Sequence, residues 1–146
     1  MLLFFDYCDS TLTDSTDEMS LRLDRALNAC VRFIFDLKKG DHVTPHYRAL
    51  AWLRAHERRR FHLLRYVHIL IHRKTPTYLA EKFSFIDTPS TRSELTLRTP
   101  IHRTSVFNKS FQVSGCREWN SLPFEVRRLE SAAAFRGALI DMVMHH

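Results

Sequence analysis

The chain is poor in glycine, with only three among its 146 residues, where about ten would be typical of this length. Tight β-hairpin turns often depend on glycine, so this scarcity favours helices over sheets. No apolar run approaches the roughly 18 residues of a membrane span. The apolar start, Leu2 to Phe5, is too short for the core of a signal peptide. We therefore expect an intracellular protein of the nucleus or cytoplasm that is neither secreted nor bound to a membrane.

Cysteine is also scarce. Cys8, Cys30 and Cys116 are widely spaced and form no C-x-x-C pair, which argues against a cysteine zinc site and a disulfide framework. Cys30 lies within an apolar helical pattern, so we expect a small buried thiol at this position. This cysteine usage fits a reducing compartment.

The sequence lacks a recognisable catalytic motif. The stretch FFDYCDS (residues 4–10) approaches the tyrosine-x-aspartate-aspartate turn that binds metal in reverse transcriptases, but Ser10 stands in place of the second aspartate. Two-metal phosphoryl transfer needs carboxylates that converge from separate segments, and only three residues precede this stretch. We interpret residues 1–14 as an acidic leader. Neither a G-x-S-x-G elbow nor a glycine-rich phosphate loop is present, so we expect no enzyme activity.

Nine histidines raise the question of a metal site. His68 and His72 are four residues apart, a spacing that zinc can use on one helix. However, the glutamate of the H-E-x-x-H motif is absent, and no third ligand stands in a recognisable pattern. We expect neither a bound metal nor another cofactor.

Apolar periodicity predicts a mainly α fold with a minor α+β part. It would be a bundle of about three main helices, followed by a small tail with one or two short strands and a C-terminal helix. The predicted bundle helices are 15–38, a short helix from Thr44, 54–74, and one or two further turns in PTYLAEKF (76–83). Ser15 and Glu18 have capping-box spacing, and Gly40 stands at the expected C-cap of the first helix. Phe33 and Phe35 broaden its apolar side, which indicates that the helix is covered from more than one direction.

The second half of the chain begins with residues 87–104, which are rich in threonine, serine, proline and arginine. This composition predicts a flexible loop with an extended piece near residues 95–98. A second strand is predicted from three apolar residues, Phe107, Phe111 and Val113.

Short helical turns are predicted on both sides of Pro123, and a final helix from Ser131. We expect Trp119 to pack beneath the preceding strand rather than stack on a base. Asn120 is expected to cap or turn the chain before Pro123. Residues 1–146 as a whole are expected to form one domain.

Charge is distributed unevenly along the chain. The formal net charge is +6, yet residues 1–24 hold six acids and one base, whereas residues 54–74 hold seven bases and one acid. Such asymmetry carries information about partners rather than about the fold. The basic segment coincides with the predicted central helix.

This basic helix carries the strongest functional signal. At 100° per residue, Arg54, Arg58, Arg65 and His72 fall within about 40° of one another, opposite an apolar stripe. Arginine suits phosphate because its planar guanidinium can donate two hydrogen bonds together. The predicted nucleic-acid-binding residues are Arg54, Arg58, Arg59, Arg65, His72, Arg73 and Lys74. A protein-facing surface and a membrane surface are alternatives, because basic amphipathic helices serve all three roles.

Arg60 departs from this pattern. It projects toward the apolar side, so it must extend its charge to solvent, pair with an acid such as Glu57, or mark an irregular first turn.

Four stretches, in this order and spacing, resemble the region that follows the polymerase core in Jockey-like non-LTR retrotransposon reverse transcriptases. They are LNACVRFIFDLKKGDHVTPHYRALAWL (27–53), ERRRFHLL (57–64), PTYLAEKF (76–83) and SFQVSGCREWNSLP (110–123). FDYCDS (5–10) also resembles the entrance to that region. The likeness covers essentially the whole chain. Departures are Leu27, where glutamine is commoner, and Cys116 within the G-x-R-x-W-N motif; the cysteine–histidine knuckle of some related elements is missing.

The resemblance implies a C-terminal module that helps to hold the RNA template or target DNA, with the catalytic palm expected before Met1. We therefore expect a non-catalytic remnant of an RNA-directed DNA polymerase with weak, sequence-independent affinity for RNA or DNA. One alternative is a module that docks on a reverse-transcriptase core. Another is a truncated element product without function.

Overall fold

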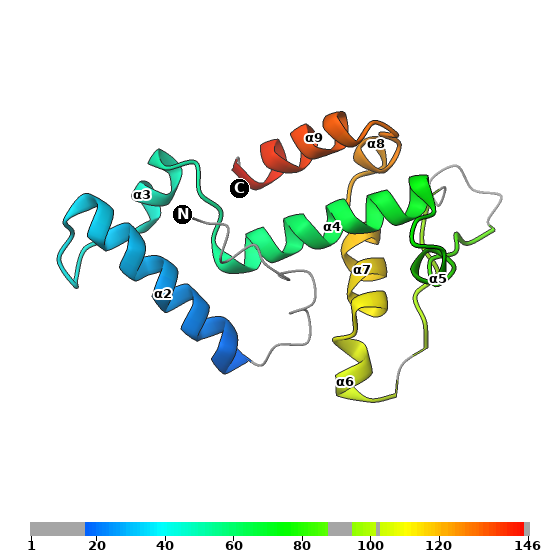
Figure 1. Ribbon diagram of the computed structural model, residues 1–146, viewed down its shortest axis with the longest axis horizontal. Helices are drawn as coiled ribbons and strands as arrows, with labels where there is room; N and C mark the ends of the chain where they lie inside the picture. The colour runs from blue at the N-terminus through cyan, green and yellow to red at the C-terminus, as the bar shows by residue number, and fades with distance from the viewer. Residues whose placement is uncertain (1–16, 88–94, 102, 145–146) are drawn as a thin grey trace.

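The computed structural model describes residues 17–87, 95–101 and 103–144 (Figure 1). The fold is mainly α, as predicted, and no strand of a sheet occurs among these residues. The helices are α2 (Asp17–Phe35), α3 (Thr44–Ala49), α4 (Ala55–Arg73), α5 (Thr77–Ala80), α6 (Ser105–Asn108), α7 (Phe111–Asn120), α8 (Phe124–Arg127) and α9 (Ala132–Met144). The acidic leader 1–14, Ser15 and much of the predicted loop lie outside the described residues. None of the described helices is long and apolar enough to cross a membrane.

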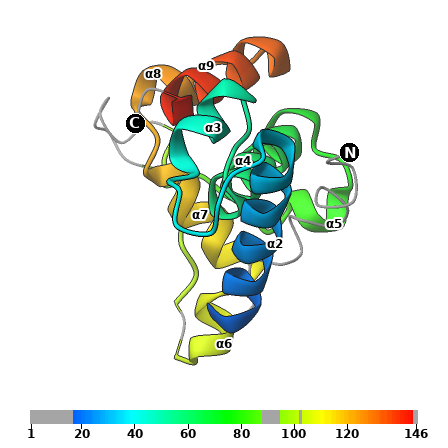
Figure 2. The same ribbon diagram turned by 90° about the vertical axis from the view of Figure 1, so that its left-hand side faces the viewer.

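Helix α4 occupies the centre of the structure. It contacts α2, α5, α7 and α9. Figure 1 shows α9 running along one side of α4 while α7 crosses its other side, and α2 lies near the N-terminal end of α4. Figure 2, turned by 90°, places α2 and α3 together at this end. The predicted helix 54–74 is confirmed to within one residue at each end.

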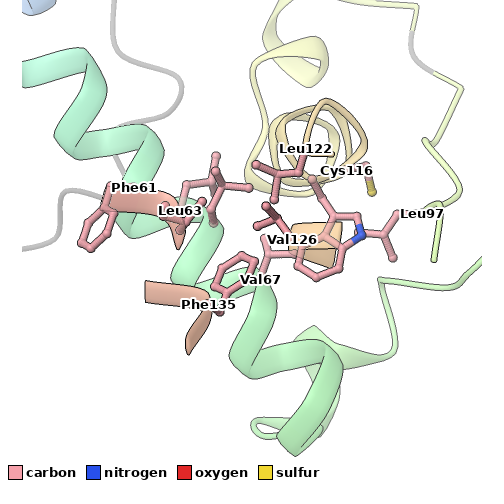
Figure 3. Close-up of a cluster of buried hydrophobic side chains, with 11 residues drawn as sticks. Phe61, Leu63, Val67, Leu97, Cys116, Leu122, Val126 and Phe135 are labelled. Atoms are coloured by element: carbon pink, nitrogen blue, oxygen red, sulfur yellow. The ribbon is translucent and has the colours of Figure 1, made fainter. Parts of the chain in front are cut away.

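The larger apolar cluster joins α4 to the second half of the chain. Its buried side chains come from α4, α7, α8, α9 and the extended segment at Leu97, as Figure 3 shows. Val67, Leu97 and Trp119 are fully buried within it. Trp119 also donates a 2.8 Å hydrogen bond from its indole Nε1 to the Leu95 carbonyl. The tryptophan is therefore buried, as the sequence predicts, but the strand expected before it is absent, because those residues are helical.

A smaller cluster joins α4 to the first half. Leu27 and Val31 of α2 pack with Tyr47 of α3 and with Ala55 at the start of α4. The Tyr47 hydroxyl donates a 3.0 Å hydrogen bond to Oδ1 of Asn28. Burial, with a smaller contribution from nearby Asp24, raises the pKa of Tyr47 to about 12, so the hydroxyl stays neutral.

The outer side of α2 departs from the prediction. Phe33 is 85% exposed, and Ile34 and Phe35 are also exposed, although the Phe35 ring contacts His46 of α3 at one edge of this side. Cys30 is half-buried rather than buried. The helix also ends earlier than predicted, because Asp36 rather than Gly40 takes the left-handed conformation, with φ of 51°.

The predicted strand at Phe107, Phe111 and Val113 is wrong, because these residues belong to α6 and α7. The Ser110 hydroxyl accepts a hydrogen bond from the Val113 N–H and so caps α7. The extended piece near residues 95–98 is present, paired through an isolated antiparallel bridge between Phe85 and Leu97.

The sequence predicted that Asn120 caps or turns the chain before Pro123, but its side chain makes a different contact. Its side chain lies against the extended segment and bonds to both backbone groups of Leu97. Oδ1 accepts from the Leu97 N–H at 2.8 Å, and Nδ2 donates to the Leu97 carbonyl at 2.9 Å. The side-chain amide of Asn120 thus makes the two hydrogen bonds to Leu97 that the backbone of a neighbouring strand would make in a sheet.

Candidate nucleic-acid interface

The predicted basic stripe lies on α4 and at its two ends. Arg54, Arg65 and His72 are exposed along one side, and Arg73 and Lys74 are exposed at the C-terminal end. Arg58 is half-buried between Arg54 and Arg65. These residues are called the basic ridge below: Arg54, Arg58, Arg65, His72, Arg73 and Lys74.

At the N-terminal end, contacts with α3 position Arg54. Its Nη2 donates a 2.6 Å hydrogen bond to Oγ1 of Thr44, and its guanidinium carbon lies 6.0 Å from the centre of the Tyr47 ring. The Arg54 backbone N–H donates to Oε2 of Glu57 at 2.8 Å, which satisfies a donor at the start of the helix. The guanidinium is therefore held against the protein while its outer edge remains exposed.

The middle of the ridge is supported by an aromatic ring. The guanidinium carbon of Arg65 lies 5.5 Å from the centre of the Phe61 ring, within the range of a cation–π contact. Phe61 itself is buried in the larger cluster. Arg65 is thus oriented by the core without losing its exposure.

The C-terminal end gathers three basic side chains where helix α4 stops. Lys74 takes the left-handed conformation with φ of 51°, and its N–H donates to the Leu70 carbonyl at 3.1 Å. Cations here are favourable because the partial negative charge of the helix dipole lies at this end. The His72 ring contacts the ring of His68, with 4.3 Å between centroids.

Most ridge residues form no ion pair with an acidic side chain of the described residues. Within this part of the chain, no ion pair joins an acidic side chain to Arg54, Arg65, His72, Arg73 or Lys74. Arg54, Arg65, Arg73 and Lys74 are exposed, so their charges are accessible to an anionic partner.

Arg59 and Arg60 lie on other sides of α4. Nη1 of Arg59 donates to Oγ of Ser20 on α2 at 3.3 Å, and the residue is half-buried. The structure therefore does not bring Arg59 together with the ridge, with which the sequence analysis grouped it. Arg60 pairs with an acid, but the acid is Glu118 of α7 at 2.8 Å rather than Glu57.

His68 is buried, and its ring contacts both a backbone carbonyl and an aromatic side chain. Its Nε2 lies 2.7 Å from the Leu129 carbonyl, to which it must donate, and its ring stacks on Phe135. Burial lowers the pKa of His68, and the neighbouring His72 lowers it further, against the opposing effect of the bond to Leu129. Among the described residues, no group of three or more metal-ligating side chains could hold a metal ion.

Four polar residues that the sequence analysis did not single out lie near Arg59 and Arg60. They are His56, Ser114, Arg117 and Glu118, and together with these arginines they line a cavity between α4 and α7. The sequence signal for this grouping is the i, i+3, i+4 spacing of Ser114, Arg117 and Glu118. This spacing places the three side chains on one face only if the segment is a helix, whereas part of it was predicted as a strand.

Comparison of the chain with protein-family models, with curated proteins and with solved structures found no match in any of the three.

Proposed function

We propose that this chain binds the phosphate backbone of RNA or DNA through the basic ridge, without reading base sequence. The observation that supports this most directly is the exposure of Arg54, Arg65, Arg73 and Lys74 in the absence of ion pairs among the described residues. Contacts to phosphate position a protein on nucleic acid but carry no sequence information. Affinity should therefore be low and sensitive to salt.

The length of the ridge sets the number of contacts. Arg54 and Lys74 are separated by 20 residues, about 30 Å along a helix at roughly 1.5 Å per residue. Basic side chains at the two ends and in the middle of the ridge can reach about three or four phosphates of one duplex. Release of that many counterions predicts a log–log salt slope near −3.

We further propose that the chain is a non-catalytic piece of a non-LTR retrotransposon reverse transcriptase. The support is the resemblance of residues 27–53, 57–64, 76–83 and 110–123 to the region after the polymerase core. A module that holds template or target is consistent with an exposed basic helix. The purified chain should not extend a primer.

The test exchanges three exposed ridge arginines, in Arg54→Glu, Arg65→Glu and Arg73→Glu. The matched control makes the same change at three exposed arginines elsewhere, Arg25, Arg103 and Arg136. Both variants change the net charge equally. Binding to an RNA duplex and a DNA duplex is measured by fluorescence anisotropy over a range of salt, and folding by circular dichroism.

The ridge variant should lose about tenfold or more in affinity, with a salt slope near zero, since each lost phosphate contact reduces the slope by about one. The control should keep a slope near −3. Equal losses in both variants would mean that net charge rather than the ridge drives binding, and the proposal would be wrong.

A second candidate function is docking on a polymerase core. It is favoured by the exposed apolar side chains at the end of α2, Phe33, Ile34 and Phe35, since clustered exposed apolar residues often mark protein contacts. This candidate predicts self-association that depends little on salt and that Phe33→Ser reduces. Gel filtration at two salt concentrations, with and without an RNA duplex, distinguishes it from binding through the ridge.

A further inference from the structure

A small polar cavity of about 140 Å³, open to solvent, lies between α4 and α7. The α4 residues that line it all belong to the N-terminal half of this helix, and Figure 1 shows α7 beside α4. The polar lining of the cavity comes from three residues of each helix: His56, Arg59 and Arg60 of α4, and Ser114, Arg117 and Glu118 of α7. A cavity of roughly 150 Å³ accepts a benzene molecule, so a tetrahedral phosphate group fits in this space.

The lining has more positive than negative charge. It holds three guanidinium groups and one carboxylate, in addition to neutral donors such as the Ser114 hydroxyl, which belongs to a residue only 5% exposed. An anion placed between the two helices is attracted by guanidinium groups on both of them. The cavity is therefore electrostatically suited to an anion.

Hydrogen bonds within the protein position two of these arginines but leave donors for a ligand. Arg60 donates from Nε to Glu118 and from Nη2 to Ser121, at 2.8 and 3.1 Å. Arg117 donates from Nη1 to Oδ1 of Asn108 at 3.4 Å. The two bonds of Arg60 fix its side chain, whereas the single long contact of Arg117 only orients it. Because a guanidinium carries five N–H donors, these contacts with described residues use a minority of the donors.

Glu118 gives the cavity a means of choosing between anions. Its Oε2 accepts from Arg60 at 2.8 Å and the residue lines the cavity, so the carboxylate, with about four lone-pair sites, can accept a further hydrogen bond. A hydrogen phosphate group retains one O–H and can donate to such a carboxylate oxygen. Sulfate carries no proton near neutral pH, so it would face the carboxylate with only acceptors, and that contact is repulsive.

We propose that the cavity between α4 and α7 binds a hydrogen phosphate group, which Arg60 and Arg117 hold by charge-assisted hydrogen bonds and Glu118 distinguishes from sulfate. This site is separate from the basic ridge. His56 and Arg65 are nine residues apart on α4, which places them on opposite sides of the helix. The site therefore does not depend on nucleic-acid binding by the ridge.

The same chemistry can come from free phosphate or from a phosphomonoester on a small molecule. The two are tested in parallel at about pH 5.5, where a phosphomonoester with a second pKa of about 6 retains its O–H. Isothermal titration calorimetry uses inorganic phosphate and adenosine monophosphate, each against sulfate at equal ionic strength. Binding of phosphate alone identifies the free ion as the ligand, whereas tighter binding of the nucleotide identifies a phosphomonoester. If sulfate binds as tightly as both, or if nothing binds, the proposal is wrong.

The site residue tested is Arg117, in the variant Arg117→Gln, with Arg136→Gln on the exposed side of α9 as the matched control. Loss of a hydrogen bond to a charged group predicts that Arg117→Gln weakens phosphate binding by about tenfold or more, whereas Arg136→Gln leaves it unchanged. Equal affinities in the two variants would place the phosphate elsewhere.

Two further variants test selectivity and location. Glu118→Gln keeps the shape of the side chain but removes its charge, so it should bind sulfate and phosphate with similar affinity. The variant with three ridge arginines changed to glutamate should still bind phosphate like the parent protein. If Glu118→Gln keeps the preference for phosphate, or if the ridge variant loses phosphate binding, the cavity is not the site.

Discussion

The imidazole ring of His68 stacks on the phenyl ring of Phe135, with 4.3 Å between their centroids and 22° between their planes. This contact joins α4 to α9 inside the larger apolar cluster. The Nε2 atom of the same ring bonds to the Leu129 carbonyl in the segment between α8 and α9. One histidine thus connects the central helix to the end of the chain, and it does so in its neutral form.

The neutral state of His68 makes stability depend on pH. Burial lowers the folded-state pKa below the unfolded value of 6.5, so the unfolded chain binds this proton more readily. The contribution to stability is complete above about pH 6.5 and falls as the pH drops from there toward the folded-state pKa. Urea unfolding at about pH 7 and about pH 5 should show a smaller pH dependence for His68→Gln, which retains an N–H for Leu129. Exposed His42→Gln should keep the full dependence of the parent protein.

The paired hydrogen bonds of Asn120 predict a large loss on substitution. Asn120→Ala leaves the N–H and the carbonyl of Leu97 without their partners in a partly buried place, so unfolding should become easier by about 1–3 kcal/mol. Asn120→Asp should be no better, because its carboxylate can accept from the Leu97 N–H but repels the Leu97 carbonyl. Urea unfolding measures both. If Asn120→Asp were as stable as the parent protein, the bond to the carbonyl would contribute nothing.

Two glycines in helices should respond oppositely to alanine. A Cβ at Gly115 would lie 3.0 Å from Cγ2 of Val67 and 3.2 Å from the Phe83 ring, whereas nothing lies within 4 Å of a Cβ at Gly137. Crowding at the α4–α7 crossing costs about 1–3 kcal/mol, more than the gain in helix propensity of up to about 1 kcal/mol. Gly115→Ala should therefore lower the thermal midpoint, and Gly137→Ala should raise it. A rise in both would show that α7 can move away from α4.

The Arg60–Glu118 ion pair should make a modest contribution that weakens with salt. Its side chains are 42% and 28% exposed, so solvent screens their attraction. A double-mutant cycle of Arg60→Ala and Glu118→Ala should give a coupling energy of about 0.5–1 kcal/mol at low salt. The same cycle in concentrated salt should give a smaller value. A coupling that salt does not change would indicate that packing, rather than charge, links the two residues.

The sequence predicted the central helix well because several signals agree there. The apolar stripe, the basic stripe and Pro76 all indicate the same helix, and α4 ends within one residue of the predicted bounds. The end of α2 was predicted less well, since a glycine at position 40 is the usual signal for a left-handed residue, yet Asp36 takes that conformation. The chain turns after Asp36, and in this turn the Lys38 N–H donates to Oδ2 of Asp41 at 2.8 Å.

The second half shows why a short apolar pattern is ambiguous. Phe111 and Val113 are two residues apart, which indicates a strand, but Val113, Cys116 and Trp119 recur every three residues and are all buried. Ser110 supplied the correct signal as an N-cap. The basic ridge follows from the period of one helix, whereas the cavity requires two helices that cross, and no pattern within one segment specifies that crossing.

Because α4 contributes side chains to both apolar clusters, opening of either cluster leaves α4 held by the other. Amide hydrogens in the middle of α4 should then exchange with deuterium only when the entire molecule unfolds, and those of α2 should exchange sooner. A ligand on either side of α4 would slow exchange throughout this helix, including at amides far from its own contacts.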